Sequence, residues 1–369
     1  MKGFGARALR MLGARLDGAS PRAALEDLAL LVGAAFFVLG FVVALPAFWG
    51  RELAIVGVGS VGHFAAVSGA VVAGLSFFAG RFALREAPDW NPPDGFALVG
   101  ERLRWWDLLA IGLAHAAVAL LGWLGVATLL ELCFQDAPVY SFPGALLVGV
   151  ALALTAYVCF LSAAELSPPS LSLVLSVFLV VGAFGSMLTS NDKHWWRDNL
   201  SALGQSYMSS APVFNLTLII AGIIVATIAR FATAWLPTGT HEQRRGRRIV
   251  RVGFVLIGIL LALVGVFPVD LFFVVHNTVA TGMAVIFAVV VIGLPWFVPE
   301  MPRVFVVLGW VYVAVIALLG VFFATGYYNL TAVELIAGVL ILSWIVVFLR
   351  TGGVAHPVRV PEPETEASV

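Results

Sequence analysis

The sequence has 369 residues, of which 61% are hydrophobic and only 11% are charged. Roughly a quarter of the residues of a soluble domain are charged, so this composition excludes a soluble globular fold. The 21 basic and 21 acidic residues cancel to a formal net charge of zero, which leaves no overall positive field for binding nucleic acid.

Ten apolar runs follow one another along the chain. A helix needs about 20 apolar residues to cross about 30 Å of hydrocarbon, and each run is of this order. Because the lipid interior offers no hydrogen-bond partner to the backbone, such runs form helices. The sequence therefore predicts an all-α polytopic transmembrane bundle of ten helices. The runs are 28–49, 53–80, 108–134, 144–165, 170–190, 212–236, 249–267, 271–298, 304–325 and 332–349.

Basic residues are distributed unequally between the two sides of this bundle. One set of alternating loops and termini holds 17 Lys and Arg residues, whereas the other holds only Arg51, Lys193 and Arg197. By the positive-inside rule the first set is cytoplasmic, so both termini are predicted inside, N-in and C-in. Arginine supplies all basic residues except Lys2 and Lys193, which favours a bacterial source and a multi-pass protein of the bacterial cytoplasmic (inner) membrane.

Four parts are predicted along the chain: a basic cytoplasmic N-terminus at 1–27, a four-helix membrane part at 28–169, a six-helix membrane domain at 170–350 and a disordered cytoplasmic tail at 351–369. No small-residue cleavage site follows the N-terminus, so the first run is expected to be a signal anchor. A basic segment at 241–248 is explained by topology. Arg230 lies within a span and is expected to extend alone to the cytoplasmic interface.

The longest extracytoplasmic loop, residues 191–205, carries the densest group of polar side chains on the outer side. Trp195 and Trp196 are residues of the type that lies at headgroup depth. Beside them, Arg197 and Asp198 can bind a polar headgroup or each other. An interfacial helix with satisfied surface charges would explain the same pattern, so the loop is either a structural cap or a headgroup site.

A second polar group lies on the same side, in the segment 264–277. Pro268 interrupts the helix there, and Asp270 can cap the next one. At 1.5 Å per residue, His276 and Asn277 would lie about 9 Å deeper. Unpaired polar groups at that depth cost a few kcal/mol, so these two residues are either hydrogen-bonding links between helices or a functional site.

Three histidines lie in three different spans. His63 and His115 would meet near mid-membrane if their spans are adjacent, and could then pair with each other or bind a metal together with His276. Ligand spacings such as HxxxH or HExxH are absent, so we predict neither a metal site nor a cofactor. No lysine lies within a span, and no P-loop, GxSxG or CxxCH motif is present, which excludes several known chemistries.

Several motifs of the second half together resemble the bacterial membrane proteins grouped as domain of unknown function 998. The motifs are Trp195-Trp-Arg-Asp-Asn-Leu-Ser-Ala-Leu-Gly, Phe214-Asn-Leu, Gly222, Gly265-Val-Phe-Pro-Val-Asp and His276-Asn. The resemblance covers residues 170–350 and implies a multi-pass unit without an established activity. The residues it carries over are Asn199, Ser201, Leu203, Gly204, Asn215, Phe267, Pro268, Asp270 and His276. A weaker similarity to the Frag1/DRAM/Sfk1 group of lipid-associated membrane proteins favours lipids over ions.

These observations favour a non-enzymatic protein that binds or transports a lipid or small amphiphile at an extracytoplasmic-facing site. Membrane lipids are the expected partners and nucleic acid is not, while a membrane-protein partner or a homo-oligomer stays open. The predicted ligand-binding residues are Trp195, Trp196, Arg197, Asp198, Asn199, Ser201, Asn215, Asp270, His276 and Asn277.

Two other functions fit the same residues. A membrane-embedded hydrolase, metal-dependent or not, would use Asp270, His276 and Ser201 as its catalytic residues. A structural or regulatory membrane subunit would use them for helix packing instead.

Overall fold

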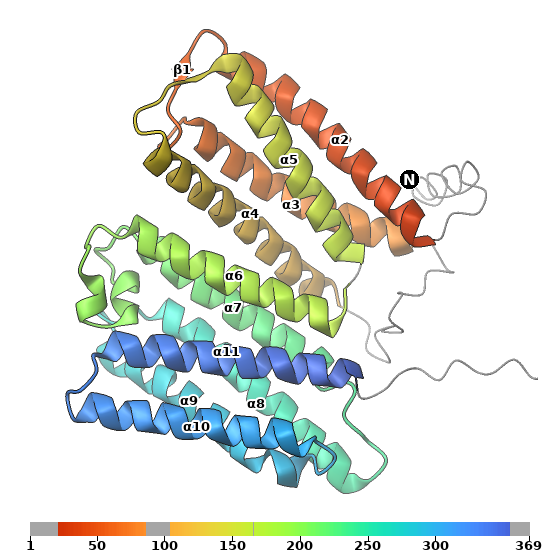
Figure 1. Ribbon diagram of the computed structural model, residues 1–369. Coiled ribbons are helices and arrows are strands. Elements are labelled where there is room, and N and C mark those ends of the chain that lie inside the picture. Colours follow the sequence, from red (N-terminus) through yellow and green to blue (C-terminus); the bar gives the residue numbers. More distant parts are fainter. Residues whose placement is uncertain (1–20, 86–103, 165, 355–369) are drawn as a thin grey trace, which may run out of the picture.

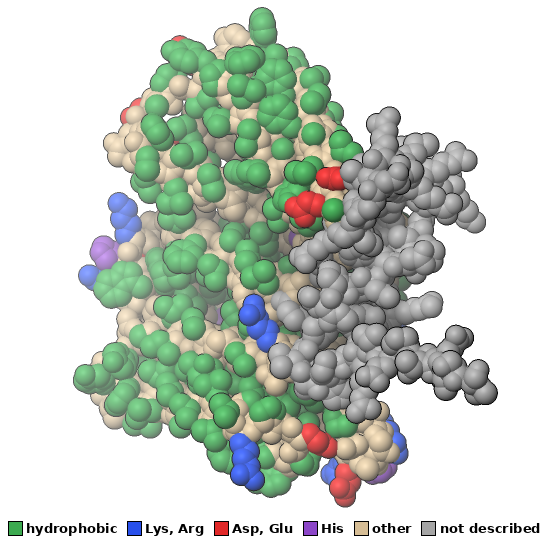
Figure 2. Space-filling view, turned by 45° about the vertical axis from the view of Figure 1, so that its right-hand side comes forward, with side chains coloured by type: hydrophobic (Ala, Val, Ile, Leu, Met, Phe, Trp, Pro, Cys, Tyr) green, Lys and Arg blue, Asp and Glu red, His purple; other side chains and the backbone are tan. Residues whose placement is uncertain are grey.

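The computed structural model describes residues 21–85, 104–164 and 166–354. Within these ranges it contains ten helices long and apolar enough to cross a membrane, which confirms the predicted all-α polytopic bundle. Hydrophobic side chains are spread over much of the described surface shown in Figure 2, as expected of a surface that contacts lipid. The predictions for residues 1–20 and 355–369 concern parts of the chain outside the described residues.

The membrane helices are α2 (Pro21–Phe48), α3 (Val61–Arg85), α4 (Trp105–Cys133), α5 (Ser141–Ala164), α6 (Pro168–Thr189), α7 (Ala211–Ala232), α8 (His241–Val266), α9 (Phe273–Phe297), α10 (Arg303–Ala324) and α11 (Leu330–Val354). Two short strands, β1 (Glu52–Leu53) and β2 (Val139–Tyr140), and two 3-10 helices, η1 (Trp195–Arg197) and η2 (Leu200–Gly204), lie in the connections. The start of α2 and the end of α11 lie at the same end of the bundle (Figure 1).

The first four helices form a layered unit in which α5 lies between α2 and α3, and α4 lies against α3 (Figure 1). At its outer end β1 pairs antiparallel with β2, with Leu53 opposite Val139. The helix α3 begins at Val61, later than the predicted span, because the preceding residues form β1 and a turn. Gly57 in that turn has a φ of 106°, a backbone conformation that favours glycine.

The last six helices form a ring, since each packs on the next and α11 packs on α6. Aromatic side chains fill its centre around Trp344, which is 0% exposed. The Trp344 ring stacks on Phe305 with centroids 5.1 Å apart and on Phe348 with centroids 5.5 Å apart. Phe254 and Phe287 pack against the same indole. This buried cluster connects α8, α9, α10 and α11.

Two glycines let the backbones of α7 and α8 come into contact. A Cβ atom on Gly222 would lie 2.3 Å from the carbonyl oxygen of Gly258. A Cβ atom on Gly258 would in turn lie 2.6 Å from the amide nitrogen of Ala226. Small residues at such crossings are the usual means of close helix packing in membranes.

The helix α8 begins at His241, before the predicted span, because Thr240 and Gln243 form a capping box. The Gln243 amide donates to the Thr240 hydroxyl oxygen, and the Thr240 amide donates to the Gln243 side chain, each at 3.1 Å. The basic segment 241–248 therefore forms the first turns of α8.

The helix α4 joins the two halves, because it packs on α3 and also on α6 and α7. Near its cytoplasmic end the buried carboxylate of Asp107 forms an ion pair with Arg230 of α7. Asp107 also accepts a hydrogen bond from the Arg104 amide at 2.8 Å, which caps α4. The expectation that Arg230 extends alone to the interface is therefore wrong, since its charge is paired between the halves.

Candidate functional site

The polar residues of the second half gather at the outer end of the ring around η2. His276 of α9 is 3% exposed, and its Nδ1 lies 2.7 Å from the carbonyl oxygen of Phe267. A carbonyl only accepts, so Nδ1 carries the ring proton and Nε2 accepts a hydrogen bond from the Ser201 hydroxyl at 3.0 Å. Because α9 begins only at Phe273, His276 lies in its first turn and is shallower than predicted.

Other side chains hold η2 from different directions. Asn215 of α7 donates through Nδ2 to the carbonyl oxygen of Gly204 at 2.9 Å. Glu334 of α11 accepts a hydrogen bond from the Leu200 amide at 2.6 Å. Together with His276 they fix η2 to α7, α9 and α11, so three of the predicted residues, Ser201, Asn215 and His276, are engaged in holding this loop.

Asp270 lies on the exposed segment between α8 and α9 and binds Ser206 just beyond η2. Its carboxylate accepts hydrogen bonds from the Ser206 amide, at 3.1 Å, and from the Ser206 hydroxyl. Partial desolvation raises the pKa of Asp270, but the hydrogen bonds from Ser206 and nearby amides outweigh it and lower the pKa below its ordinary value. The alternative that Asp270 caps α9 is wrong, because the capping position is Phe272.

Of the remaining predicted residues, Asn277 lies on α9 and the others lie on the outer loop. Trp196 is exposed, and the Arg197 guanidinium lies 5.5 Å from the centroid of its ring. Asn329 at the start of α11 donates to the Trp196 carbonyl oxygen at 2.9 Å. Trp195 and Asn277 are half-buried, and Asp198 is exposed. The structure thus brings Ser201 and His276 into contact and leaves Trp196, Arg197 and Asp198 facing outward.

The pair of Ser201 and His276 has the geometry of a nucleophile and its base. Acyl transfer also needs backbone amides that bind an oxyanion. The amides of Leu200 and Ser201 instead face the carboxylate of Glu334, and Ser201 is only 9% exposed. This arrangement suits a fixed outer loop better than it suits catalysis.

The three span histidines do not come together. His63 lies at the outer end of α3, where its Nδ1 is 3.5 Å from the Gly59 amide. His115 lies in the inner half of α4 and His276 at the outer end of α9. Within the described ranges no group of three or more His, Cys, Asp and Glu side chains is placed to hold a metal ion.

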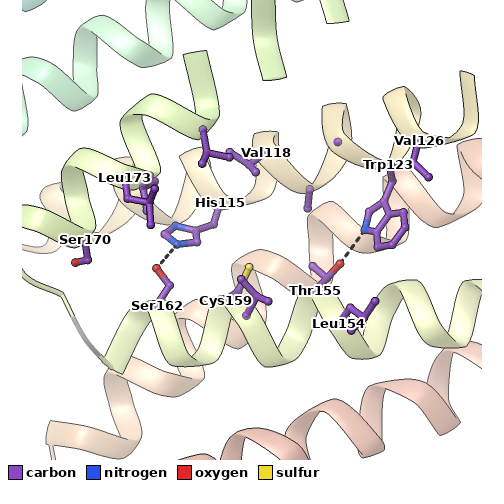
Figure 3. Close-up of a pocket in the computed structure, with 15 residues that line it drawn as sticks. His115, Val118, Trp123, Val126, Leu154, Thr155, Cys159, Ser162, Ser170 and Leu173 are labelled. Carbon is purple, nitrogen blue, oxygen red and sulfur yellow. Dashed lines mark hydrogen bonds between the residues drawn. The ribbon is translucent and has the colours of Figure 1, made fainter. Parts of the chain in front are cut away.

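A cavity of about 540 Å³ lies between α4, α5 and α6, where the two halves of the bundle meet (Figure 3). Its lining is mostly aliphatic, and among the described residues no Asp, Glu, Lys or Arg side chain contributes to it. The aliphatic residues include Val118, Val126, Leu154, Val158, Leu173, Val174 and Val177. The cavity is thus an apolar space within the membrane-spanning region.

The main polar side chains that line this cavity are paired with one another or with backbone. His115 donates from Nδ1 to the Ile111 carbonyl oxygen and accepts at Nε2 from the Ser162 hydroxyl, each at 2.8 Å. The Trp123 indole donates to Thr155 Oγ1 at 2.9 Å, and the Thr155 hydroxyl in turn donates to the backbone at 2.7 Å. Figure 3 shows both pairs connecting α4 with α5. These two pairs fix the helices that line the cavity and leave few polar groups that could form hydrogen bonds with a bound molecule.

Sequence reasoning considered His115 as a partner of His63 or as a metal ligand and did not find this cavity. Ser162 and Thr155 have no distinguishing sequence context, because hydroxyl residues are common in membrane helices. Their partners lie 47 and 32 positions away on another helix. Only the packing of α4 beside α5 and α6 reveals the cavity.

Comparison with known proteins adds one finding. Residues 173–351 match the model of a family described as protein of unknown function (DUF998). No curated protein and no solved structure matches the chain. The matched residues include η2, α7 to α11 up to residue 351 and most of α6, so the outer polar site lies inside the match. The cavity is lined partly by α6, inside the match, and partly by α4 and α5, outside it.

Proposed function

We propose a function from the geometry of the chain, because the family whose model residues 173–351 match, DUF998, is described as having no known function. The sequence motifs predicted this match. This integral membrane protein binds the hydrocarbon chain of a membrane lipid or small amphiphile in the cavity between α4, α5 and α6. The observation that carries the proposal is a cavity of about 540 Å³ within the span region, to which no described Asp, Glu, Lys or Arg side chain contributes.

The size and polarity of the cavity support a hydrocarbon occupant. Small-molecule sites usually measure about 300–1,000 Å³, and this cavity falls within that range. A polar solute would lose its bonds to water on entering, and His115, Thr155 and Trp123 are already paired. An acyl or isoprenoid chain loses no hydrogen bonds there and already resides in the surrounding bilayer.

The position of the cavity suggests how a chain lies in it. Along α4 its lining extends from His115 to Val126, about 16 Å at 1.5 Å per residue. Ser162 and Ser170 line the end nearer the cytoplasmic side of the predicted topology. We infer that the polar end of the amphiphile lies toward these two serines and its chain toward Val126.

The outward-facing residues predicted from the sequence have a separate place in the proposal. Trp196 and Arg197 are exposed at the outer end, where an indole and a guanidinium suit the headgroup region. They would contact headgroups of the outer leaflet, whereas Ser201, Asp270 and His276 would act by holding the loop that carries them.

A pair of glycines on α4 allows a sharp test. Gly122 lines the cavity, Gly125 does not, and a Cβ atom added at either would meet nothing within 4 Å. Gly122→Leu therefore fills the cavity, while Gly125→Leu adds the same atoms elsewhere on the same helix. Native mass spectrometry of protein purified in mild detergent should find a bound lipid or amphiphile in the wild type and in Gly125→Leu, and much less of it in Gly122→Leu. Equal lipid content in all three proteins would overturn the proposal.

The native cysteines provide a second readout. Cys159 lines the cavity and Cys133 is exposed. In a Cys133→Ser background, a small apolar maleimide should label Cys159 slowly while the ligand is bound and faster after delipidation. Labelling that is independent of delipidation would mean that no chain occupies the space beside Cys159.

A further inference from the structure

A second cluster of polar groups lies where the start of α11 contacts η2, far from the cavity. Glu334 is half-buried, and one of its carboxylate oxygens accepts the Leu200 amide at 2.6 Å. No Lys, Arg or His in the described part of the chain forms an ion pair with it. A carboxylate removed from water without a counter-charge is costly, and ionisable groups of this kind in membrane proteins usually mark a functional site.

Two more oxygen atoms beside this carboxylate have no partner. Asn199 Oδ1 and Thr331 Oγ1 are buried and make no hydrogen bond within the described structure. Thr331 is 7% exposed and lies three residues before Glu334 on α11, so the two side chains leave the same face of the helix. Asn199 directly precedes Leu200, whose amide binds Glu334. The unpartnered oxygens therefore belong to two residues next to this contact: Thr331 shares a helix face with Glu334, and Asn199 adjoins the residue whose amide binds it.

We propose that Glu334, Asn199 and Thr331 bind a sodium ion at the outer end of the bundle. All three groups offer oxygen, the ligand atom that hard cations prefer, and none offers nitrogen or sulfur. The single carboxylate balances a single positive charge. Asp270, an acidic side chain at the same end of the bundle, is engaged with Ser206, so it does not supply the second negative charge that a divalent ion would favour.

A bound cation accounts for three observations together: the uncompensated carboxylate, the unpartnered amide oxygen and the unpartnered hydroxyl. If Glu334 were protonated, it could donate a hydrogen bond to Asn199 Oδ1, but the Thr331 hydroxyl oxygen would still have no partner. The ion would also join η2 to α11, adding to the bonds from His276 and Asn215. This site is independent of the proposed lipid chain.

The test measures thermal unfolding of the purified protein as NaCl replaces N-methylglucamine chloride at constant pH and ionic strength. The melting temperature of the wild type should rise and saturate with Na⁺. Glu334→Gln should abolish the response. Thr331→Val preserves the shape of the side chain, and should shift half-saturation to at least about tenfold higher Na⁺.

The matched control is Glu131→Gln, which neutralises another half-buried glutamate at the outer end of α4 and should respond to Na⁺ like the wild type. If Glu334→Gln does not fold, Thr331→Val decides alone. A wild type that is insensitive to Na⁺, variants that respond like it, or a stability that depends on pH but not on Na⁺ would each overturn the proposal.

Discussion

The hydroxyl of Ser201 donates a hydrogen bond to Nε2 of His276 at 3.0 Å, although the two residues are 75 positions apart in the chain. The other ring nitrogen donates to the Phe267 carbonyl oxygen at 2.7 Å. One buried imidazole thus connects η2, the end of α8 and the first turn of α9.

His276→Ala should destabilise the protein by about 1–3 kcal/mol, because it leaves the Phe267 carbonyl and the Ser201 hydroxyl without partners in a buried place. Ser201→Ala removes one bond only and should cost less. The double variant should cost less than the sum of the two, since both changes remove the same bond. Unfolding in mixed detergent micelles measures these values. His63→Ala, at a half-buried position with only a 3.5 Å contact, is the control, and a comparable loss there would contradict the assigned role.

Asp107→Asn should weaken the joint between the two halves. The change leaves the charge of Arg230 unpaired, and the Arg230 side chain is 23% exposed. The free energy of unfolding should therefore fall by about 1–3 kcal/mol, less than the loss of about 3–5 kcal/mol that is typical when a fully buried ion pair is broken. Adding Arg230→Gln to Asp107→Asn should restore part of the loss. Thermal unfolding of the single and double variants tests this, with the exposed Glu300→Gln as control. Strictly additive effects would show that the ion pair is not coupled.

Gly258→Ala should separate α7 from α8, because its Cβ would lie 2.6 Å from backbone atoms that cannot rotate away. We expect a loss of about 1–3 kcal/mol or failure to fold. Gly338→Ala is the matched change, since a Cβ at Gly338 of α11 meets nothing within 4 Å and alanine favours the helix. Comparing the melting temperatures of the two variants checks the close crossing, and equal values would refute it.

Asp270 should make the protein sensitive to acid. The hydrogen bonds from Ser206 lower its folded pKa below the ordinary value of 3.8, so its contribution to stability is present above that pH and is lost as the pH falls through the folded pKa. Between about pH 5 and pH 2 the melting temperature of Asp270→Asn and of Ser206→Ala should fall less than that of the wild type. Acid profiles that superimpose for all three proteins would exclude this role.

The candidate site was only partly predictable. Ser201, Asn215, Asp270 and His276 could be named from the sequence, because polar residues next to apolar runs are conspicuous. Their contacts could not be predicted, because Ser206, Gly204 and Glu334 acquire a role only when η2 folds against α7 and α11.

Hydropathy and charge by themselves determined the ten-helix membrane architecture. A segment that crosses hydrocarbon must be long and apolar, and such segments recur along the sequence, where they are easily recognised. Only the tertiary structure decided which polar groups meet. Ser201 and His276 come into contact, Arg230 finds Asp107, and an apolar cavity opens between α4, α5 and α6. Apolar segments are nearly interchangeable in sequence, so the three-dimensional fit of their side chains decides which helices pack together. The same fit therefore decides where a cavity or a hydrogen bond between helices lies.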